Sequence, residues 1–300
     1  MERKLYKFSG AGNDFVVIDG REGDVASFRE VARIEALCRE FRTDGLMILG
    51  QEMPGQAGHD VNAGHDVMAD PDRPSVDFIM EFYNPDGSGG MMCGNGGRCI
   101  VAFADYLGIR PSCHPELAEG SYLFRAPDGL HTGEILERPG GSTGSPTDRW
   151  IVRIKMIDVQ GITPMLGGYF LNTGTRHFVK FVDDVEQVDI DTEGKALRWN
   201  EAFAPVGTNV NFVHVAPDGL HVRTFEKGVE GETLACGTGL TASAIAAYHA
   251  GIPSVIPGEA KESYRLRARQ DWLSVNFTPG ADEKFTDVYL TGPARLVEIR

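Results

Sequence analysis

Two cysteines of this chain stand in the same short sequence context. Cys93 and Cys236 each begin a Cys-Gly-x-Gly stretch that runs on into small and apolar residues. Such a run predicts that each cysteine lies at the start of a buried helix. A helix N-terminus presents unpaired N–H groups and a partial positive charge, which stabilise a thiolate and lower the pKa of the thiol. The adjacent glycines let the backbone come close to a ligand, so the same N–H groups are suited to hold a carboxylate.

This pattern predicts the inversion of an amino acid at its α-carbon. One cysteine, as the thiolate, removes the α-proton, and the other, as the thiol, delivers a proton to the opposite face. The helix N–H groups stabilise the charge that spreads onto the carboxylate as the carbanion forms. We therefore expect a small-molecule amino-acid substrate. Because the sequence has no strand-embedded GxGxxG, no P-loop and no convincing cluster of metal ligands, we expect no cofactor and no metal.

The other cysteines are predicted to be buried side chains without a chemical role. The chain has 5 cysteines, an odd number, and no CxxC pair, so neither a disulfide framework nor a zinc ribbon is indicated. Cys38, Cys99 and Cys113 lack the glycine context of the matched pair, and we interpret them as small packed hydrophobes.

The chain carries an internal duplication that places the matched cysteines at equivalent positions. At an offset of 143 residues Cys93 falls on Cys236, and neighbouring Gly, Ala, Ile and Phe residues match without a gap. A weaker echo links residues 12–19 to residues 174–183. We interpret the duplication as two homologous domains that face each other across a cleft and supply the two faces of the reaction. The duplication alone would also preserve a structural cysteine in both halves.

Each half shows the same order of predicted elements. Alternating strands are predicted at 76–82 and 220–225, each followed by a turn-rich connector and then by Cys-Gly-x-Gly. The runs that follow, to Tyr106 and to Tyr248, are apolar nearly all round, which predicts two buried helices. Gly108 and Gly251 then occupy positions typical of a left-handed helix cap. Further strand candidates, at 150–156 and 273–277, favour a mixed and largely antiparallel sheet.

Two stretches are predicted to be surface loops. Residues 51–75 are rich in Gly, Asp, His and Pro, and residues 139–148 are rich in Gly, Ser, Thr and Pro. The first stretch includes, in a tandem copy, side chains of the types that bind metals: His59, Asp60, His65 and Asp66. Because nothing rigid fixes their geometry, we interpret it as a mobile insertion rather than a metal site.

Charge and hydropathy exclude several classes of partner. With 29 Lys and Arg against 43 Asp and Glu, the formal net charge is -14. Such a surface repels phosphate backbones and anionic lipid, so we expect neither a nucleic-acid partner nor membrane association. The N-terminus lacks the apolar core of a signal peptide, and no later segment approaches a membrane span. We expect a cytoplasmic protein.

At these cysteines the chain resembles the diaminopimelate epimerase family of cofactor-independent amino-acid epimerases. Gly-Ala-Gly-Asn-Asp-Phe at 10–15 is similar to the family's N-terminal motif. Asn-Pro-Asp-Gly-Ser at 84–88, with Met-Cys-Gly-Asn-Gly-Gly-Arg-Cys at 92–99, resembles its first active-site motif. Glu-Lys-Gly at 226–228, with Glu-Thr-Leu-Ala-Cys-Gly-Thr-Gly at 232–239, resembles its second.

The resemblance implies an isomerase that converts LL- to meso-diaminopimelate in lysine and peptidoglycan-precursor biosynthesis, and that forms a homodimer. Cys93 and Cys236 are then the acid/base pair. The implied substrate-binding residues are Asn13, Asn84, Gly94, Asn95, Thr175, Asn209, Glu226, Lys227, Gly237 and Thr238. His177, Glu226 and Arg176 are implied to be auxiliary residues that tune the thiols or assist binding. From the residues alone, Asn13 and Asn84 also suit ordinary turn positions.

The fold implied by the resemblance is α/β, with two pseudo-symmetric domains, each a mixed, mostly antiparallel sheet wrapped around a central helix. We expect the first domain to span residues 1–130 and the second residues 131–286. The last strand, in residues 287–300, is expected to return to the first domain.

Three departures from the family pattern bear on the substrate. Thr175 and Arg176 stand where the family usually has Asn-Pro or Ser-Pro, Lys227 stands where it has arginine, and its glycine-rich loop is shortened to residues 41–45. In the family the first two positions grip the distal end of the substrate. Lysine cannot bind a carboxylate in the bidentate manner of arginine. Either Arg176 restores a guanidinium there, or the substrate differs.

Three other functions compete with this interpretation. A racemase for another amino acid, such as histidine or lysine, would share the mechanism and is not separated by sequence. A thiol hydrolase built on Cys93, His177 and Asn209 would leave the second cysteine motif without a role. A binding protein that has lost the chemistry would not need an intact cysteine pair.

Overall fold

The computed structural model describes residues 3–51, 74–89, 92–112, 114, 117–140, 149–253 and 262–300. The chain divides into two compact units: unit 1 is Met1–Ile154 with Ala294–Arg300, and unit 2 is Lys155–Pro293. Unit 1 contains, in chain order, β1 (Tyr6–Gly10), β2 (Asn13–Asp19), the short helix η1 (Ala26–Arg29), α1 (Val31–Phe41), β3 (Gly45–Gly50), β4 (Phe78–Tyr83), α2 (Gly94–Tyr106), β5 (Ser121–Ala126), β6 (Gly129–Glu137) and β7 (Trp150–Lys155).

Unit 2 repeats the core of this order and adds further strands and short helices. It contains β8 (Ile162–Met165), β9 (Gly168–Asn172), β10 (Arg176–Phe181), η2 (Val185–Gln187), η3 (Ile190–Gly194), α3 (Lys195–Arg198), η4 (Glu201–Phe203), β11 (Asn209–Ala216), β12 (Gly219–Glu226), β13 (Gly231–Thr233), α4 (Gly237–His249), β14 (Glu262–Arg267), β15 (Trp272–Pro279), η5 (Ala281–Glu283) and β16 (Phe285–Ile299). β16 belongs to unit 2 up to Pro293 and to unit 1 beyond it.

The strand pairings confirm that the two units are built alike. In unit 1, β1 and β2 are antiparallel, β2 and β3 parallel, β3 and β4 antiparallel, β4 and β5 parallel, and β5 and β6 antiparallel. In unit 2, β9 to β12, then β14 and β15, follow the same alternation. Each unit is therefore a mixed, mostly antiparallel sheet, as expected.

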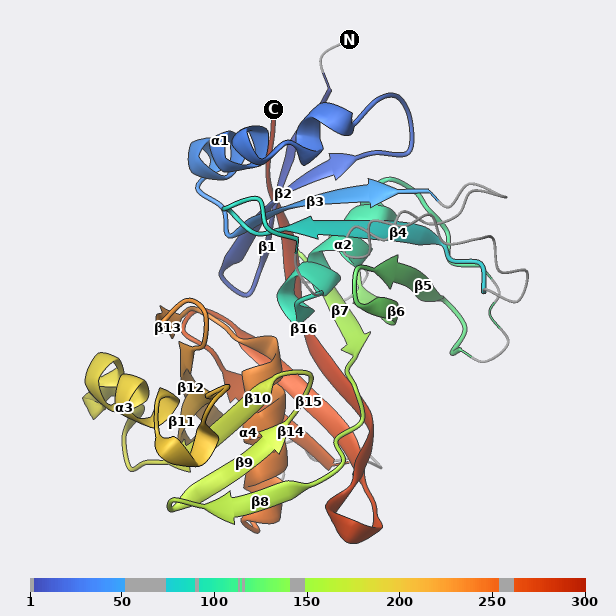
Figure 1. Cartoon of the computed structure of the whole chain (residues 1–300). Coiled ribbons are helices and arrows are strands. Elements are labelled where there is room, and N and C mark those ends of the chain that lie inside the picture. Colours follow the sequence, from blue (N-terminus) through green and yellow to red (C-terminus); the bar gives the residue numbers. More distant parts are fainter. Residues whose placement is uncertain are drawn as a thin grey trace. The chain divides into compact units, whose positions relative to one another are not determined.

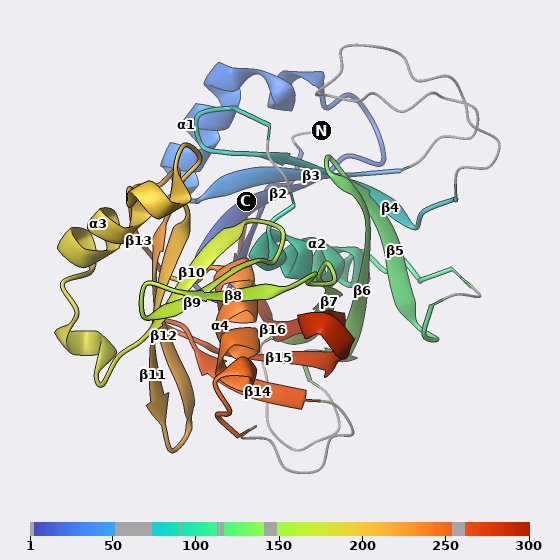
Figure 2. The same ribbon diagram turned by 60° about the horizontal axis from the view of Figure 1, so that its bottom comes forward.

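A central helix lies against the sheet of each unit. α2 contacts β1, β2, β3 and β6, and α4 contacts β9 to β12, β14 and β15 (Figures 1 and 2). Both helices are buried over most of their length because their residues are apolar on nearly every side, which confirms the prediction. Each ends before a glycine with positive φ, Gly108 (φ 73) and Gly251 (φ 73). The left-handed caps are therefore also confirmed.

The boundary between the units differs from the sequence expectation of 130/131. The hairpin of β5 and β6 pairs Ala126 with Gly129, and β7 pairs with β6, so all three strands belong to unit 1. The chain changes unit at 154/155, after this meander is complete. Composition could not show this, because the Gly/Pro-rich residues 139–148 precede the boundary in the sequence and do not coincide with it. Residues of β16 from Arg295 to Ile299 pair with β1.

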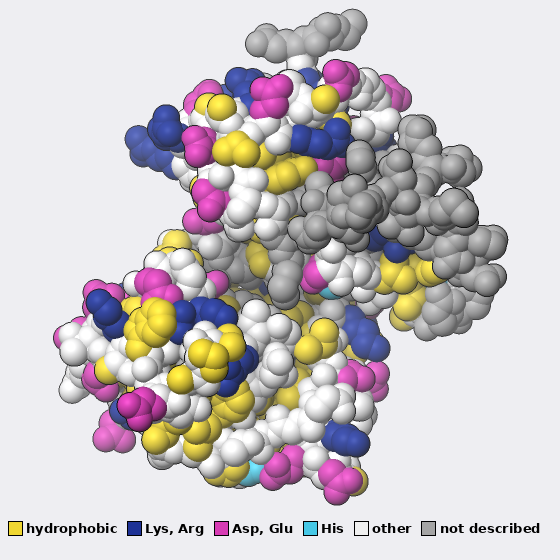
Figure 3. All heavy atoms as spheres, in the orientation of Figure 1, with side chains coloured by type: hydrophobic (Ala, Val, Ile, Leu, Met, Phe, Trp, Pro, Cys, Tyr) yellow, Lys and Arg dark blue, Asp and Glu magenta, His cyan; other side chains and the backbone are white. Residues whose placement is uncertain are grey.

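Some expectations fall on residues outside those described. They are the insertion with His59, Asp60, His65 and Asp66, most of the 139–148 stretch, and Cys113. On the face drawn in Figure 3, Lys and Arg side chains are interspersed with Asp and Glu side chains over the described surface of each unit. Among the described residues, no helix combines the length and the apolarity that a membrane crossing needs.

The turn between β1 and β2 packs directly onto the start of α2. Gly10 pairs with Asn13, and the two residues between them, Ala11 (φ 59) and Gly12 (φ 96), both have positive φ. This backbone matches the tight hairpin turn that follows the strand twist. A Cβ on Gly10 would lie 2.7 Å from the Asn95 carbonyl oxygen and 2.9 Å from Cys99 Sγ. The glycine is thus what lets the turn reach the helix.

We predict that Gly10→Ala destabilises unit 1. The new Cβ meets backbone of α2, which cannot move cheaply, so the free energy of unfolding should fall by about 1–3 kcal/mol. Gly50→Ala is the matched control, because its Cβ would meet nothing nearer than 3.8 Å. Denaturant unfolding of both variants tests this. Equal stability of the two variants would show that the turn does not depend on the close approach.

Candidate functional site

In unit 1 the predicted base lies at the start of the central helix. Cys93 is the N-cap of α2, and its Sγ accepts a hydrogen bond from the Gly96 N–H at 3.2 Å. Gly94 and Asn95 are the first helical residues, whose N–H groups have no partner inside the helix. Cys93 is half-buried. A sulfur bonded by a helix N–H is suited to carry negative charge.

Two amides are bonded to each other at the start of α2, and a buried arginine orients them. Arg98 Nη2 donates to Asn95 Oδ1 at 2.8 Å, and Arg98 Nη1 donates to the Gly94 carbonyl at 3.2 Å. Asn95 Nδ2 in turn donates to Asn13 Oδ1. Because Arg98 only donates, Asn95 must present its oxygen to Arg98 and its nitrogen to Asn13. The Asn13 side chain therefore keeps its own N–H groups for another acceptor.

Asn84 lies elsewhere in unit 1, in the turn after β4. Its Nδ2 donates to Ser88 Oγ at 3.0 Å, and its backbone carbonyl accepts from Gly87 N at 2.9 Å. These bonds are those of an Asn at a turn position. They neither require nor prevent the predicted contact with substrate.

In unit 2 the equivalent cysteine is also the N-cap of the central helix, but its sulfur has different neighbours. Cys236 is buried and its side chain makes no cap hydrogen bond. Its Sγ lies 3.4 Å from Thr238 Oγ1. Thr238 Oγ1 lies 2.9 Å from His177 Nε2 and 3.2 Å from Thr175 Oγ1. The structure thus brings Cys236 together with three residues predicted from sequence.

Asn209 joins the same group from the neighbouring strand. His177 on β10 and Asn209 on β11 are direct partners in the parallel ladder. Asn209 Nδ2 donates to the Arg176 carbonyl at 2.9 Å, and its Oδ1 accepts from the Lys227 N–H at 2.8 Å. The backbone of Lys227 is therefore tied to Asn209, while its side chain is exposed.

Arg176 lies apart from this group. Its side chain follows the opposite face of β10 from His177, because successive side chains of a strand alternate. The guanidinium lies 5.1 Å from the Phe170 ring centre and donates to the Phe203 carbonyl at 3.3 Å. The predicted role of Arg176 at the distal end of a substrate would require it to leave these contacts.

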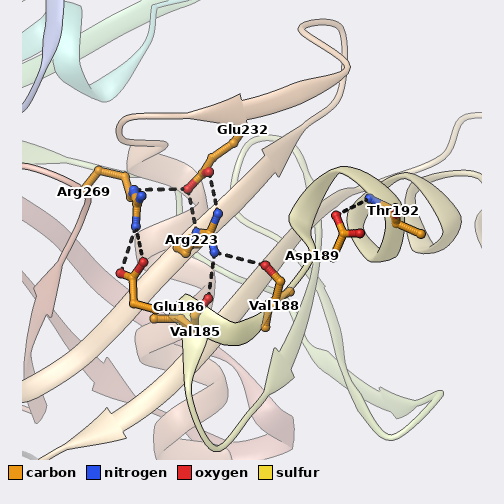
Figure 4. Close-up of polar contacts among 8 residues, drawn as sticks. All are labelled: Val185, Glu186, Val188, Asp189, Thr192, Arg223, Glu232 and Arg269. Carbon is orange, nitrogen blue, oxygen red and sulfur yellow. Dashed lines mark hydrogen bonds and ion pairs between the residues drawn. The ribbon is translucent and has the colours of Figure 1, made fainter.

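The segment that carries Glu226 and leads to Cys236 is a hairpin held by two arginines (Figure 4). β12 and β13 pair within it, and Thr233 Oγ1 donates to Glu226 Oε2 at 2.8 Å. Arg223 binds Glu232 in a bidentate manner at 2.8 and 2.7 Å, and also donates to the Val185 carbonyl at 2.8 Å. Arg269 Nε lies 3.3 Å from the same Glu232 carboxylate.

The two ends of this network differ in exposure, which leads to a prediction. The side chains of Arg223 and Glu232 are 11% and 21% exposed, whereas Glu186, which binds Arg269, is 66% exposed. Arg223→Gln should lower the free energy of unfolding by about 1.5–3 kcal/mol, the range for hydrogen bonds to charged groups. Glu186→Gln should cost at most about 1 kcal/mol, since exposed pairs contribute little. Denaturant unfolding measures both, and equal losses would refute the ranking.

Burial of His177 leads to a prediction about acid stability. Complete desolvation lowers the pKa of His177 to about 3 from its ordinary 6.5. The unfolded chain therefore binds this proton more readily, so the stability that depends on neutral His177 is complete above pH 6.5 and falls toward pH 3. Below about pH 6.5 the free energy of unfolding should therefore decrease by about 1.4 kcal/mol per pH unit. His177→Gln does not titrate and should not show this decrease. If unfolding of the wild type and the variant has the same pH dependence between 7 and 5, His177 is not buried as a neutral ring.

Several residues of the two groups were not predicted from sequence. Arg98 is fully buried in unit 1, and Asn211 and Thr224 are buried beside His177 in unit 2. A signal for Asn211 was present, since it follows Asn209 by two positions on one strand and so shares its face. Arg98 stands four residues after Gly94. Because residues four apart on a helix are neighbours, the sequence also allowed the prediction that Arg98 lies over the first turn.

Two of the remaining cysteines are buried, as expected. Cys38 packs among the side chains between α1 and the sheet, and Cys99 is fully enclosed. Burial raises the pKa of both thiols. Neither resembles the matched pair, which lies at helix starts.

Comparisons with known proteins identify the relatives of this chain. Residues 169–297 match the family model described as diaminopimelate epimerase. The diaminopimelate epimerase of Flavobacterium psychrophilum is 35% identical, with 98% of this chain and 98% of that protein covered. The diaminopimelate epimerase of Aquifex aeolicus is 36% identical, with 96% and 94% covered.

Solved structures of low sequence identity share the fold. A PhzF-family phenazine biosynthesis protein of Bacillus anthracis superposes with a TM-score of 0.67 at 10% identity, covering 100% of this chain and 99% of its own. A probable proline racemase of Agrobacterium radiobacter superposes with a TM-score of 0.61 at 15% identity, covering 100% and 92%. The architecture of two units with central helices is therefore shared well beyond close relatives.

Proposed function

The chain belongs to the diaminopimelate epimerase family of isomerases, and from this membership we propose that it converts LL-diaminopimelate to meso-diaminopimelate with two cysteine bases and no cofactor. The proposal places the chain in lysine and peptidoglycan-precursor biosynthesis, in the cytoplasm and as a homodimer. The observation that supports it best is the matched pair of N-cap cysteines, Cys93 and Cys236, on equivalent helices of two units with the same strand pairing.

The proposed reaction moves one proton off the α-carbon and another onto it. The thiolate of one cysteine takes the α-proton, and the electron pair of the broken C–H bond spreads onto the carboxylate. N–H groups at Gly94, Asn95, Gly237 and Thr238 stabilise that charge. The thiol of the other cysteine then delivers its proton to the opposite face, which leaves the inverted centre and the reverse pair of protonation states.

The polar side chains named from the family resemblance are proposed to bind the substrate. Asn13 retains N–H groups for an acceptor, as its bond to Asn95 shows. Asn84, Thr175, Asn209 and Glu226 are proposed to contact the other polar groups, and His177 to tune a thiol. For the distal carboxylate we propose Lys227, because its side chain is exposed and its backbone is tied to Asn209, whereas Arg176 is bound to Phe203.

A second candidate is a racemase with the same mechanism and a different amino acid. The departures at Thr175, Arg176 and Lys227 favour it, because they lie where the family grips the distal end of its substrate. Histidine and lysine are the alternatives that the sequence left open.

The experiment that separates these candidates is α-proton exchange in D₂O, followed by NMR. The panel contains LL- and meso-diaminopimelate, histidine, lysine and alanine, each without added metal or pyridoxal phosphate. We expect exchange and epimerisation of diaminopimelate alone. Exchange of another amino acid would move the assignment to the second candidate, and exchange of none would overturn both. Loss of diaminopimelate turnover in Lys227→Ala but not in Arg176→Ala would support the proposed distal contact.

A further inference from the structure

Behind Cys236 lies a continuous chain of hydrogen bonds that reaches the interior of unit 2. It starts at Thr224, passes through Asn211 and His177, and arrives at Thr238, whose Oγ1 is 3.4 Å from Cys236 Sγ. Thr224 is 3% exposed, and Asn211 and His177 are 0% exposed. Because water does not reach these groups, their hydrogen bonds have to be satisfied by each other, and this fixes which atom donates in each bond.

The direction of donation is determined at Asn211. The Phe178 carbonyl can only accept, and the side-chain nitrogen of Asn211 lies 3.2 Å from it. The side-chain oxygen of Asn211 accepts from Thr224 Oγ1 at 2.9 Å. A flipped amide would turn its oxygen toward the Phe178 carbonyl, which cannot donate, and that bond would be lost. Its nitrogen also lies 3.0 Å from His177 Nδ1, so that ring atom must accept.

A ring nitrogen that accepts carries no proton, which fixes the tautomer of His177. The neutral ring then has its proton on Nε2. This atom lies 2.9 Å from Thr238 Oγ1 and 2.9 Å from Thr175 Oγ1, so both hydroxyl oxygens are placed to accept from it. With its oxygen accepting from His177, the Thr238 hydroxyl turns its own hydrogen toward another acceptor. Thr175 Oγ1, at 3.2 Å, and Cys236 Sγ, at 3.4 Å, are both in reach. An ionised sulfur is the stronger acceptor of the two, because it carries the charge.

We propose that Asn211 and His177 are positioning residues that hold the Thr238 hydroxyl as a hydrogen-bond donor to the thiolate of Cys236. The proposal rests on the proposed function, in which Cys236 must carry negative charge during half of the catalytic cycle. Neither positioning residue exchanges a proton with the substrate. His177 acts through the one proton on Nε2, and Asn211 acts by keeping Nδ1 without a proton.

The glycine of the second cysteine motif is what gives Asn211 its place. A Cβ on Gly239 would lie 2.3 Å from Asn211 Oδ1. In unit 1 a Cβ on the matched glycine, Gly96, would meet sulfur atoms instead, with Cys93 Sγ at 3.3 Å and the Met47 sulfur at 3.4 Å. There the cysteine sulfur accepts from a backbone N–H of its own helix. The two cysteines are therefore stabilised differently. Cys93 is stabilised by the helix backbone, and Cys236 by the chain of side-chain hydrogen bonds from Thr224 to Thr238, which we call the relay.

The first test reads the tautomer directly and uses no substrate. In protein labelled with ¹⁵N-histidine, long-range ¹H–¹⁵N spectra distinguish a protonated Nε2 from a protonated Nδ1, and the His177 signal is identified by its loss in His177→Gln. We expect Nε2–H in the wild type. Asn211→Asp replaces the donor with a carboxylate oxygen, so Nδ1 should become protonated. Thr224→Val is the control, since it removes a bond to Asn211 and should leave Nε2–H. A wild-type ring with Nδ1–H, or with both nitrogens protonated at neutral pH, overturns the proposal.

The second test reads the sulfur. Alkylation of Cys236 by iodoacetamide at pH 7.5 is followed by peptide mass spectrometry, with Cys93 as the internal reference. Thr238→Val should slow alkylation of Cys236 about three- to tenfold. The loss of a hydrogen bond to the thiolate lowers the fraction of Cys236 that is ionised, and the greater nucleophilicity of the remaining thiolate offsets part of that decrease in rate. Thr238→Ser, which keeps the hydroxyl, should retain the wild-type rate, and Cys93 should be unaffected in both. Equal rates in the Val and Ser variants refute the relay even if Cys236 proves essential. If the alkylation rates support the relay but Cys236→Ser keeps full epimerase activity, the proposed function is refuted instead.

Discussion

Replacing either Cys93 or Cys236 with serine is expected to slow epimerisation by about 10²–10⁴-fold, the contribution usual for a general acid or base. A hydroxyl is a far weaker base than a thiolate near neutral pH, and its shape otherwise preserves the N-cap position of each helix. Cys38→Ala is the control, because it removes a thiol that is buried between α1 and the sheet and whose pKa is raised by burial.

The two serine variants should also differ from each other in which epimer exchanges its α-proton, a difference that the control variant does not produce. Each retains one thiolate, which can still remove and return the α-proton on its own side. In D₂O each variant should therefore exchange the α-proton of only one epimer, with retention of configuration, and the two variants should select opposite epimers. Exchange of both epimers by one variant, or activity above about a tenth of the wild type, would exclude a mechanism with two cysteine bases.

Gly239→Ala is expected to give the second largest effect, on rate and on stability together. Alanine favours a helix interior by about 0.5–1 kcal/mol over glycine. Against this, the new Cβ would lie 2.3 Å from Asn211 Oδ1, and Asn211 can retreat only by giving up its bonds to Thr224, Phe178 and His177. Broken bonds of buried polar groups cost about 1–3 kcal/mol each, so the clash outweighs the gain in helix propensity.

We therefore expect Gly239→Ala to be less stable than the wild type and at least about tenfold slower, since a loss of 1.4 kcal/mol in the transition state is tenfold in rate. Gly231→Ala is the control from the same unit, because no atom lies within 4 Å of its added Cβ. Unfolding midpoints and turnover of both variants give the answer. A Gly239→Ala protein with normal stability and rate would mean that Asn211 moves freely, which would also remove the basis of the relay.

The sequence by itself determined the architecture, because the internal duplication repeats the same pattern of elements in both halves of the chain. The offset that aligns Cys93 with Cys236 also aligns the two helices, Gly94–Tyr106 and Gly237–His249, at both ends. Apolar residues on every side of a helix allow only a central position, and alternation in the flanking runs allows only strands with one buried face. The N-cap positions of both cysteines followed from the same local patterns, since capping depends on neighbours in the chain.

The tertiary structure alone decided how polar groups on different strands are connected. Arg176 packs on Phe170, and the backbone of Lys227 is bonded to Asn209. Both contacts depend on which faces of the strands meet, and no local sequence pattern indicates them. The unit boundary after Ile154 likewise depends on β7 pairing with β6 rather than on composition. The donor direction at Asn211 is set by the Phe178 carbonyl of β10, and its side-chain oxygen then accepts from a hydroxyl of β12. A hydrogen bond acts over about 3 Å, so partners brought together by the sheet can be recognised only after the sheet has formed.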